Sequence, residues 1–375
     1  MNGRGREHRE VVIIGAGLLG LATGRALAGR GIDVVILEQA NQAGHPRSGS
    51  RGASRIFRLG YEDPRYVRMA QLARQSWLEL EQESGRRLLS TIGQLDLGSG
   101  LDQLAEAMTA AGAPFERLNS SDAHGRFPNV AGTGPVLWEP DSGVLSASEA
   151  LHALAAVSRA EMRTSCRVDR IRPGEGRGPV TVEHGDGALT ADVVVVCAGA
   201  WSSSLLASIG INLALQPSLE QIAYFLPRAG VSLESLPILL ERPSRGPVAY
   251  GLPTPSLGWY KLALHHGGLP VDPGEVSMQP DPALDQELAV LARRLLPGLV
   301  PEVVSSERCL YDNSPDEDFV LDRVGDVVIG AGTSGHGFKF GPLWGDLLAA
   351  LVTGDAAPID LSPFSCGRPR LRPPD

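Results

Sequence analysis

The chain has 375 residues, of which 43% are hydrophobic and 21% charged, a balance typical of folded globular proteins that excludes a wholly disordered chain. At roughly 150 residues per domain, this length predicts two to three domains. The formal net charge of −9 at pH 7 argues against a nucleic-acid partner, because the chain has no excess of basic groups to neutralise phosphates.

The chain opens with the pattern of a dinucleotide-binding unit. Residues 11–14 are β-branched and wholly apolar, which predicts a buried parallel strand. They lead into the motif GAGLLG at residues 15–20, a predicted helix to residue 30, and a second predicted strand over 32–37. A GxGxxG motif inside such a strand–helix–strand unit predicts a dinucleotide whose phosphates lie at the helix N-terminus.

Each residue of this motif has an expected task. Gly15 permits the tight turn, and Gly17 lets the backbone approach a pyrophosphate. Gly20 and Gly24 allow the helix to pack closely against the strand. Glu38 ends the second strand, where its carboxylate accepts both ribose hydroxyls. An acidic residue here disfavours a 2′-phosphate, so FAD or NAD is expected rather than NADP.

The same segment also has some features of a secretory signal peptide. Arg4, Arg6 and Arg9 precede the apolar run 11–22, and residues 26–28 resemble a signal-peptidase site. The dinucleotide unit explains these residues better, because it also accounts for the glycine spacing and Glu38. No stretch reaches 18 uninterrupted apolar residues, so we expect no membrane-spanning segment and a cytoplasmic protein.

The rest of the chain alternates helical and extended patterns. Helices are predicted over 63–83, near 101–111, and over 151–160, 282–296 and 338–352. Asp281 is the expected N-cap of the fourth of these. Strands are predicted over 167–171, 180–184, 191–197, 216–226, 247–252, 258–264 and 326–329. The proline-rich tail, 366–375, is expected to be poorly ordered.

Nucleotide-binding elements occur at both ends and in the middle of the chain, so we expect interleaved domains. The predicted fold class is α/β (α+β), with a Rossmann-like FAD-binding domain and an antiparallel-sheet substrate domain. The FAD-binding domain is expected to comprise 1–85, 145–218 and 315–375. The substrate domain is expected to comprise 86–144 and 219–314.

Cysteines and lysines are sparse. The four cysteines are far apart, with neither a CxxC pair nor histidines at metal-ligand spacing, so neither a disulfide framework nor a metal site is expected. The only lysines are Lys261 and Lys339. Two lysines could remain by chance in a chain whose composition favours arginine. Alternatively, each supplies an ammonium group whose function a guanidinium cannot replace.

Six motifs in order, over nearly the whole chain, resemble the monomeric sarcosine oxidase and N-methyltryptophan oxidase family of flavoprotein amine oxidases, within the D-amino acid oxidase superfamily. The motifs are GAGLLG (15–20), SRGASRIFRLGY (50–61), VVVVCAGAW (193–201), AYGLPTPSLGWYKLALH (249–265), RCLYDNSPDEDF (308–319) and GAGTSGHGFKFGP (330–342). The resemblance implies a monomeric oxidase that transfers hydride from a secondary-amine amino acid, N-methyl or cyclic, to N5 of FAD. Loss of the hydride leaves the imine, and reoxidation of the flavin by O2 then gives H2O2.

The resemblance also implies the catalytic residues. Cys309 carries FAD through a thioether, although a cysteine at a strand end is otherwise an ordinary core residue. Lys261 activates oxygen, Arg55 lies against the flavin, and His265 lies near the substrate amine. Lys261 and His265 share one face of a strand, whereas His266 points to the surface. From the residues alone, a histidine in a strand such as His265 is more often structural.

Further residues are assigned to the substrate and the flavin in the same way. Arg58 and Lys339 hold the substrate carboxylate, while Tyr250 and Tyr311 line the pocket. The remaining cofactor contacts come from two segments. Gly335 and Gly337 belong to the glycine-rich loop, and Lys339 follows at the start of the last helix. Arg51 belongs to the segment after the dinucleotide-binding unit. Without the resemblance, Arg55 and Arg58 could be a surface pair, and Tyr250 and Tyr311 would more often be core residues.

One position departs from the family. Arg51 stands where sarcosine oxidases have a histidine that holds the flavin, which puts strict sarcosine specificity in doubt. The alternatives are therefore an imino acid or primary amino acid oxidase or dehydrogenase on the same scaffold. A flavin-binding subunit without turnover is a further alternative.

Overall fold

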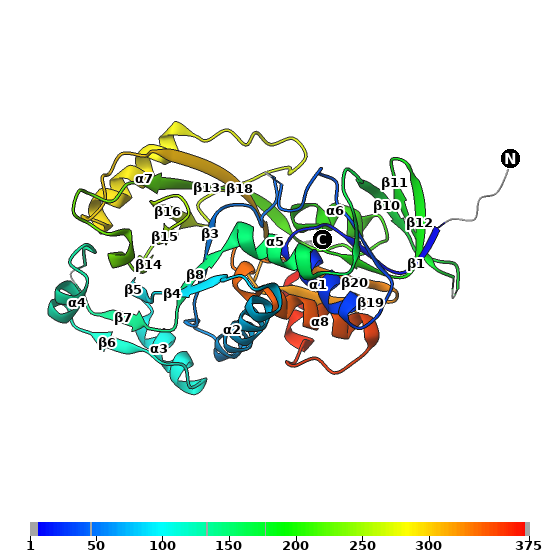
Figure 1. Ribbon diagram of the computed structural model, residues 1–375, viewed down its shortest axis with the longest axis horizontal. Helices are drawn as coiled ribbons and strands as arrows, with labels where there is room; N and C mark the ends of the chain where they lie inside the picture. Colours follow the sequence, from blue (N-terminus) through cyan, green and yellow to red (C-terminus); the bar gives the residue numbers. More distant parts are fainter. Residues whose placement is uncertain (1–6, 46, 133, 177, 372–375) are drawn as a thin grey trace.

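Three β-sheets with helices packed around them form the computed structural model, which describes residues 7–45, 47–132, 134–176 and 178–371. The nine-stranded sheet lies toward one end of the long axis and the eight-stranded sheet toward the other (Figure 1). The predicted class, α/β with both parallel and antiparallel sheets, is confirmed. The predicted domain boundaries stay a prediction.

The eight-stranded sheet has a parallel centre. Strand β1 (Glu7–Ile14) pairs in parallel with β2 (Val34–Leu37) and with β12 (Gly187–Val196), which also pairs with β20 (Val327–Ala331). Residues 11–14 of β1, all of β2 and residues 193–196 of β12 are apolar and buried, as parallel strands covered on both faces must be. The other members are β9 (Glu161–Arg163), β10 (Val168–Arg172), β11 (Val180–His184) and β19 (Val320–Val324).

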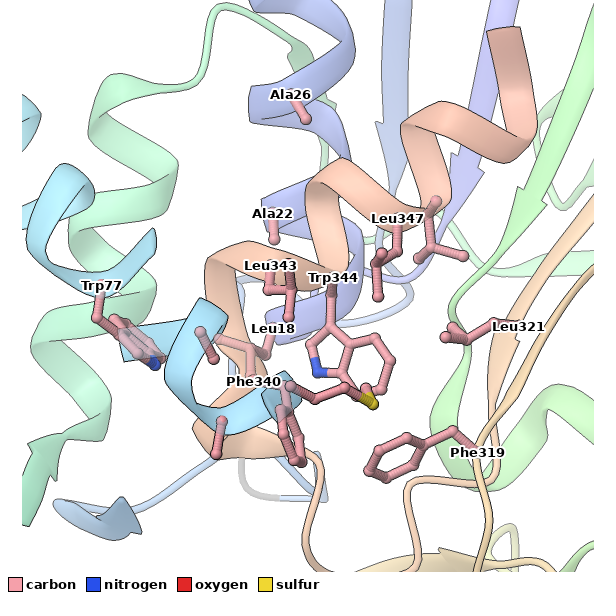
Figure 2. Close-up of a cluster of buried hydrophobic side chains, with 14 of the residues drawn as sticks. Leu18, Ala22, Ala26, Trp77, Phe319, Leu321, Phe340, Leu343, Trp344 and Leu347 are labelled. Carbon is pink, nitrogen blue, oxygen red and sulfur yellow. The ribbon is translucent and has the colours of Figure 1, made fainter. Parts of the chain in front are cut away.

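Helices α1 (Leu18–Gly29) and α8 (Gly341–Thr353) pack against each other beside this sheet. Figure 2 shows their apolar side chains together, with Leu18 and Ala22 of α1 facing Leu343 and Trp344 of α8. Helix α5 (Ala147–Val157) contacts α1. These contacts fix the position of α1, whose N-terminus lies within the glycine motif.

The nine-stranded sheet is antiparallel except where β14 (Ile238–Arg242) pairs with β5 (Gln94–Gly98). Its long strand β13 (Gln216–Phe225) lies between β16 (Trp259–His265) and β18 (Ser305–Asn313). The remaining strands are β6 (Glu116–Leu118), β7 (Val136–Glu139), β15 (Val248–Thr254) and β17 (Leu269–Pro270). Helix α7 (Pro282–Leu295) packs on this sheet through buried leucines.

A small third sheet consists of β3 (Ser54–Phe57), β4 (Leu89–Thr91) and β8 (Gly143–Ser146). Next to it lies the long helix α2 (Pro64–Ser84). The shorter helices are α3 (Leu101–Ala110), α4 (Ser120–Arg126) and α6 (Ser202–Ala207). Among the described residues, no helix is both long and apolar enough to cross a bilayer.

Most predicted elements are confirmed, some with shifted ends. The α2 and α7 helices begin where expected, and the carboxylate of Asp281 accepts the Ala283 N–H as the predicted N-cap. Helix α5 begins four residues earlier than predicted, directly after β8. The last helix is interrupted, because Gly341 has a non-helical φ of 11° after a 3-10 turn at Phe338–Phe340. Lys339 therefore precedes α8 and is not on it.

Three further expectations are wrong or lie outside the described residues. The tail is ordered through Leu371, because Arg368 forms an ion pair with Asp316 and Leu371 is fully buried. Residues 372–375 and the N-terminal Arg4 and Arg6 lie outside the described residues. Cys309 lies in the middle of β18, opposite Glu220 of β13, and not at a strand end.

Candidate active site

A cleft of about 370 Å3 follows the carboxyl ends of β1 and β2. Gly15 has φ +104°, which L side chains rarely adopt, and a Cβ there would lie 2.4 Å from the Cys197 carbonyl oxygen. A Cβ on Gly20 would lie 1.9 Å from the carbonyl oxygen of Gly15. The tight turn and the helix–strand packing predicted for these two glycines are therefore confirmed.

Glu38 is buried at the end of β2 and lines this cleft. Its Oε2 accepts a hydrogen bond from the Ala16 N–H at 2.8 Å, and its Oε1 accepts one from the Ala40 N–H at 2.9 Å. The two bonds fix the carboxylate at the cleft. Each oxygen has a second lone pair, so the group still has acceptor capacity for hydroxyls.

The cleft suits the FAD expected from the sequence. Gly17 lines it, and an added Cβ on Gly17 would meet no backbone atom, only the hydroxyl oxygens of Ser50 at 3.1 Å and Ser48 at 3.9 Å. Asp312 also lines the cleft. Its Oδ1 accepts a hydrogen bond from Thr333, whereas its buried Oδ2 has no partner among the described residues. Such an unpartnered buried atom is costly unless a ligand satisfies it.

A second cavity, of about 520 Å3, continues from the first. The two share five lining residues, which are Gly49, Leu310, Thr333, Gly337 and Phe338. The second cavity is lined largely by charged and aromatic side chains from β3, β15, β16, β18 and the loop before α8. Every catalytic and substrate-binding residue expected from the sequence lines this second cavity.

Strand β18 presents one face to the second cavity. Glu307, Cys309 and Tyr311 alternate along it and all line the cavity, as the two-residue period of a strand requires. Burial raises the pKa of the Cys309 thiol, and Arg55 opposes that rise. The aromatic ring of Tyr311 lies beside Gly335 and interacts with the side chain of Tyr250. Cys309 is thus a buried cysteine that faces a cavity.

Strand β16 supplies Lys261 and His265 on one face, as predicted. The Lys261 side chain is buried, and its Nζ donates a hydrogen bond to the Ser54 carbonyl oxygen at 2.6 Å. Burial, reinforced by Arg55, lowers the pKa of Lys261 to about 7. Burial also lowers the pKa of His265 well below its usual value, and nearby positive charges add to this.

Two further cations of the second cavity lie beside one aromatic ring. Arg58 lies over the Tyr61 ring, 4.1 Å from its centroid, and donates to the Gly60 carbonyl. Lys339 Nζ lies 5.3 Å from the centroid of the same ring and donates to the His336 carbonyl at 2.7 Å. Burial and Arg58 hold the pKa of Lys339 well below its usual value. Among the described residues, neither cation has a carboxylate within ion-pair distance.

Arg55 contacts Gly49, a residue that lines both cavities, and Arg51 lies two residues after Gly49 in the sequence. Arg55 donates hydrogen bonds to the carbonyl oxygens of Ser54 and Gly49, at 3.0 and 3.1 Å, and its guanidinium lies 5.4 Å from the Phe338 centroid. Arg51 forms an ion pair with Glu307 at 3.0 Å. Arg51, Arg55 and Arg58 all line the second cavity. A purely superficial position for Arg55 and Arg58 is therefore excluded.

Sequence reasoning missed several residues of the second cavity. Glu307 stands two residues before Cys309, and the strand period was a signal for it. Tyr61 closes the FRLGY motif and lies under the cations. Arg242 pairs with the fully buried Asp96, while burial and Asp96 raise the pKa of Glu139 to about 8. No local motif marks this last group, since its members come from β5, β7 and β14.

One expectation about a site residue is wrong. His266 was expected to point to the surface, away from His265, by the alternation of a strand. It lies just after β16 with φ +56°, and its ring centroid is 4.1 Å from that of His265. The left-handed conformation turns the His266 ring back toward its neighbour, so the alternation no longer holds.

The chain matches known proteins over almost its full length. The family model described as DAO, FAD dependent oxidoreductase, matches residues 10–351. Peroxisomal sarcosine oxidase of Mus musculus is 36% identical, covering 96% of each chain. Monomeric sarcosine oxidase of Bacillus sp. is 30% identical, covering 97% of each. Among solved structures, NikD, described as an unusual amino acid oxidase essential for nikkomycin biosynthesis, superimposes with a TM-score of 0.85 at 26% identity, covering 96% of this chain and 97% of NikD.

Proposed function

The chain belongs to the DAO family of FAD-dependent oxidoreductases, and we propose that it is an oxidase of amino acids that carry a secondary amine, N-methylated or cyclic. The observation that carries the proposal is the content of the second cavity. Both lysines of the chain, Lys261 and Lys339, line it together with Arg58 and Cys309. Every other basic residue of the chain apart from histidine is an arginine. A role of both lysines in the reaction would explain why these two positions differ.

The first cleft is the proposed binding site of FAD. Gly15, Gly17 and Gly20 bring the backbone close to the pyrophosphate, and Glu38 accepts the ribose hydroxyls. The proposed contacts nearer the second cavity are Arg51, Arg55, Gly335, Gly337 and Lys339, with a thioether bond from the Cys309 sulfur. Bound FAD supplies the acceptor for a hydride and passes two electrons to O2, giving H2O2.

Arg58 and Lys339 are the proposed binding site of the substrate carboxylate. They approach the same Tyr61 ring from within one cavity, and neither has an acidic partner among the described residues. Burial disfavours the charged form of Lys339, so a bound carboxylate would supply the missing counter-charge. This requirement selects amino acids over simple amines.

The remaining residues act on the other end of the substrate and on oxygen. His265 faces the cavity with its imidazole next to the proposed amine position, and Tyr250 and Tyr311 form its wall. Lys261 is the proposed site of oxygen activation, because a fixed cation stabilises the negative charge that develops on O2. A monomer is also proposed, in line with the curated relatives that are named monomeric.

Acid precipitation of the purified protein tests the cofactor assignment. We expect yellow flavin to stay in the pellet of the wild type and to be released by Cys309→Ala. Cys366→Ala is the matched control, since Cys366 lines neither cavity, and it should retain pellet flavin. Release of flavin from the wild type would contradict the covalent bond while leaving the FAD site intact.

An amine panel with peroxide readout tests the substrate class. We expect H2O2 from N-methyl or cyclic amino acids and none from matched amines that lack the carboxylate. Size-exclusion chromatography of the same sample tests the monomer. A flavin-loaded protein that forms no peroxide with any member of the panel would contradict the oxidase proposal.

A further inference from the structure

Two histidines and one glutamate meet at the edge of the second cavity. The side-chain ligand atoms of His265, His266 and Glu317 all lie within 4.8 Å of one another. His265 belongs to the end of β16, His266 to the turn that follows, and Glu317 to the loop between β18 and β19. We propose that these three side chains form a binding site for a divalent transition-metal ion such as Zn2+, and that the bound ion inhibits amine oxidation.

The backbone holds this cluster together in an unusual way. Among the described residues, only four non-glycine residues have positive φ, and two of them are His266 (+56°) and Glu317 (+59°). Such conformations are costly for residues other than glycine and concentrate at functional sites. Here both residues turn their side chains to the same place. The strain has no role in the proposed FAD or carboxylate sites.

The donor atoms are available. His266 Nε2 is buried, has no hydrogen-bond partner among the described residues, and lies 3.8 Å from Oε1 of Glu317, too far for a hydrogen bond. The rings of His265 and His266 both pack against Tyr311, at centroid distances of 5.8 and 5.9 Å. An aromatic wall of this kind limits the directions in which the imidazoles can turn.

The neighbouring His336 does not extend the cluster. One of its ring nitrogens lies 2.9 Å from the Glu317 carbonyl oxygen and the other 3.2 Å from the Tyr61 hydroxyl. Both nitrogens are therefore engaged. The site thus has three protein ligands, two imidazoles and one carboxylate, with a fourth tetrahedral position open, a donor set that zinc accepts.

The geometry needs only a small adjustment. Ligands about 2.1 Å from a tetrahedral ion lie roughly 3.4 Å apart, closer than the present limit of 4.8 Å. Glu317 can make this movement, because its side chain is 63% exposed. The histidines need not leave the cavity edge.

Inhibition follows from the position of the cluster and rests on the proposed function. An ion held here takes up the imidazole of His265, which faces the substrate, and its open position binds an amine or carboxylate. Coordination ties up the amine lone pair, which must be free when hydride leaves the neighbouring carbon. Metal binding itself requires no turnover, so the two proposals fail separately.

Calorimetric titration of the flavin-loaded full chain with ZnCl2 tests the site directly. We expect one Zn2+ per chain, with affinity at least tenfold weaker in His266→Asn and in Glu317→Gln, because loss of a ligand costs no less than loss of a supporting residue. Asparagine tolerates positive φ, so the first variant preserves the turn. His152→Asn is the matched control. His152 also lies 3.8 Å from a glutamate, Glu149, but within the part of the chain that the structure describes it belongs to no group of three metal-ligating side chains.

Two results would overturn the metal site: no saturable binding by the wild type, or equal Zn2+ affinity of His266→Asn and the wild type. Inhibition is tested by the peroxide assay, with each variant compared with its own metal-free rate. We expect Zn2+ to inhibit the wild type and His152→Asn, EDTA to reverse the inhibition, and His266→Asn to resist it. Binding of Zn2+ without inhibition would refute the second half of the proposal.

Discussion

The two connected cavities are built in opposite ways. In the first cleft, the backbone of the glycine motif forms part of the wall, and the carboxylate of Glu38 is fixed by main-chain N–H groups. In the second cavity, long charged side chains from distant strands converge. The comparison shows that the shape of the first cleft depends on glycines, which have no Cβ. The second cavity depends instead on the charged groups of its side chains.

A substitution that only adds a methyl group should therefore be most damaging in the first cleft. Gly20→Ala places a Cβ against the Gly15 carbonyl oxygen, a backbone atom that cannot move aside. We expect purified protein without flavin and a free energy of unfolding lower by about 3 kcal/mol. Absorbance and chemical denaturation measure the two effects. Gly29→Ala is the control, since a Cβ there meets open space, and equal loss in both variants would break the comparison.

In the second cavity, removal of one charge should disable one half of the reaction and leave the other. Lys261→Met is expected to slow reoxidation by O2 about 100-fold or more, with anaerobic reduction by substrate little changed. Lys339→Met, the only other lysine substitution possible, should do the reverse and raise KM for the amino acid. Stopped-flow absorbance separates the two half-reactions. Identical defects in both variants would show that the lysines are merely structural.

The pH dependence should also separate the half-reactions. The folded pKa of Lys261, about 7, lies below its usual value because of burial and Arg55, while Glu307 acts in the opposite direction. The Lys261 ammonium group is charged below pH 7 and loses its proton above it. Reoxidation should therefore slow by up to about tenfold for each unit that the pH rises above 7. Reduction should speed up instead, because the substrate amine loses its proton.

Lys261→Arg provides the control for this pH dependence, since arginine keeps its charge throughout the range. The fall in the reoxidation rate above pH 7 should then disappear. If the wild type instead reoxidises at the same rate from pH 6 to 9, the proposal that the Lys261 cation activates O2 is contradicted.

The smallest effect is expected at the ion pair between Arg51 and Glu307. Both side chains are about one quarter exposed, at 25% and 27%, so Glu307→Gln should cost about 1 kcal/mol or less in stability. It should also move the midpoint of the reoxidation profile to lower pH, because Glu307 supports the charge on Lys261. Asp102→Asn, which breaks the exposed pair with Arg117, is the control. An unchanged midpoint would place Glu307 outside the oxygen site.

The same contrast explains how much of the molecule could be predicted from the sequence. The glycine turn and the buried strands follow from neighbouring residues, so they were predictable. The side-chain cavity was predictable only where a motif named it, as for Lys261 and Lys339. His266 and Glu317 escaped prediction because their positive φ is set by tertiary packing. Arg242 escaped because its partner Asp96 comes from a strand 146 residues away in sequence.

The two lysines also determine how the folded surface responds to chemistry. Both are buried, with 2% and 4% of their area exposed, and every other side-chain cation in the chain besides histidine is an arginine. Amine-directed cross-linkers, acylating tags and resins therefore find no lysine on the outside of this protein. A reagent that does label a lysine reports that the cavity has opened, which makes lysine acylation a direct probe of opening at the site.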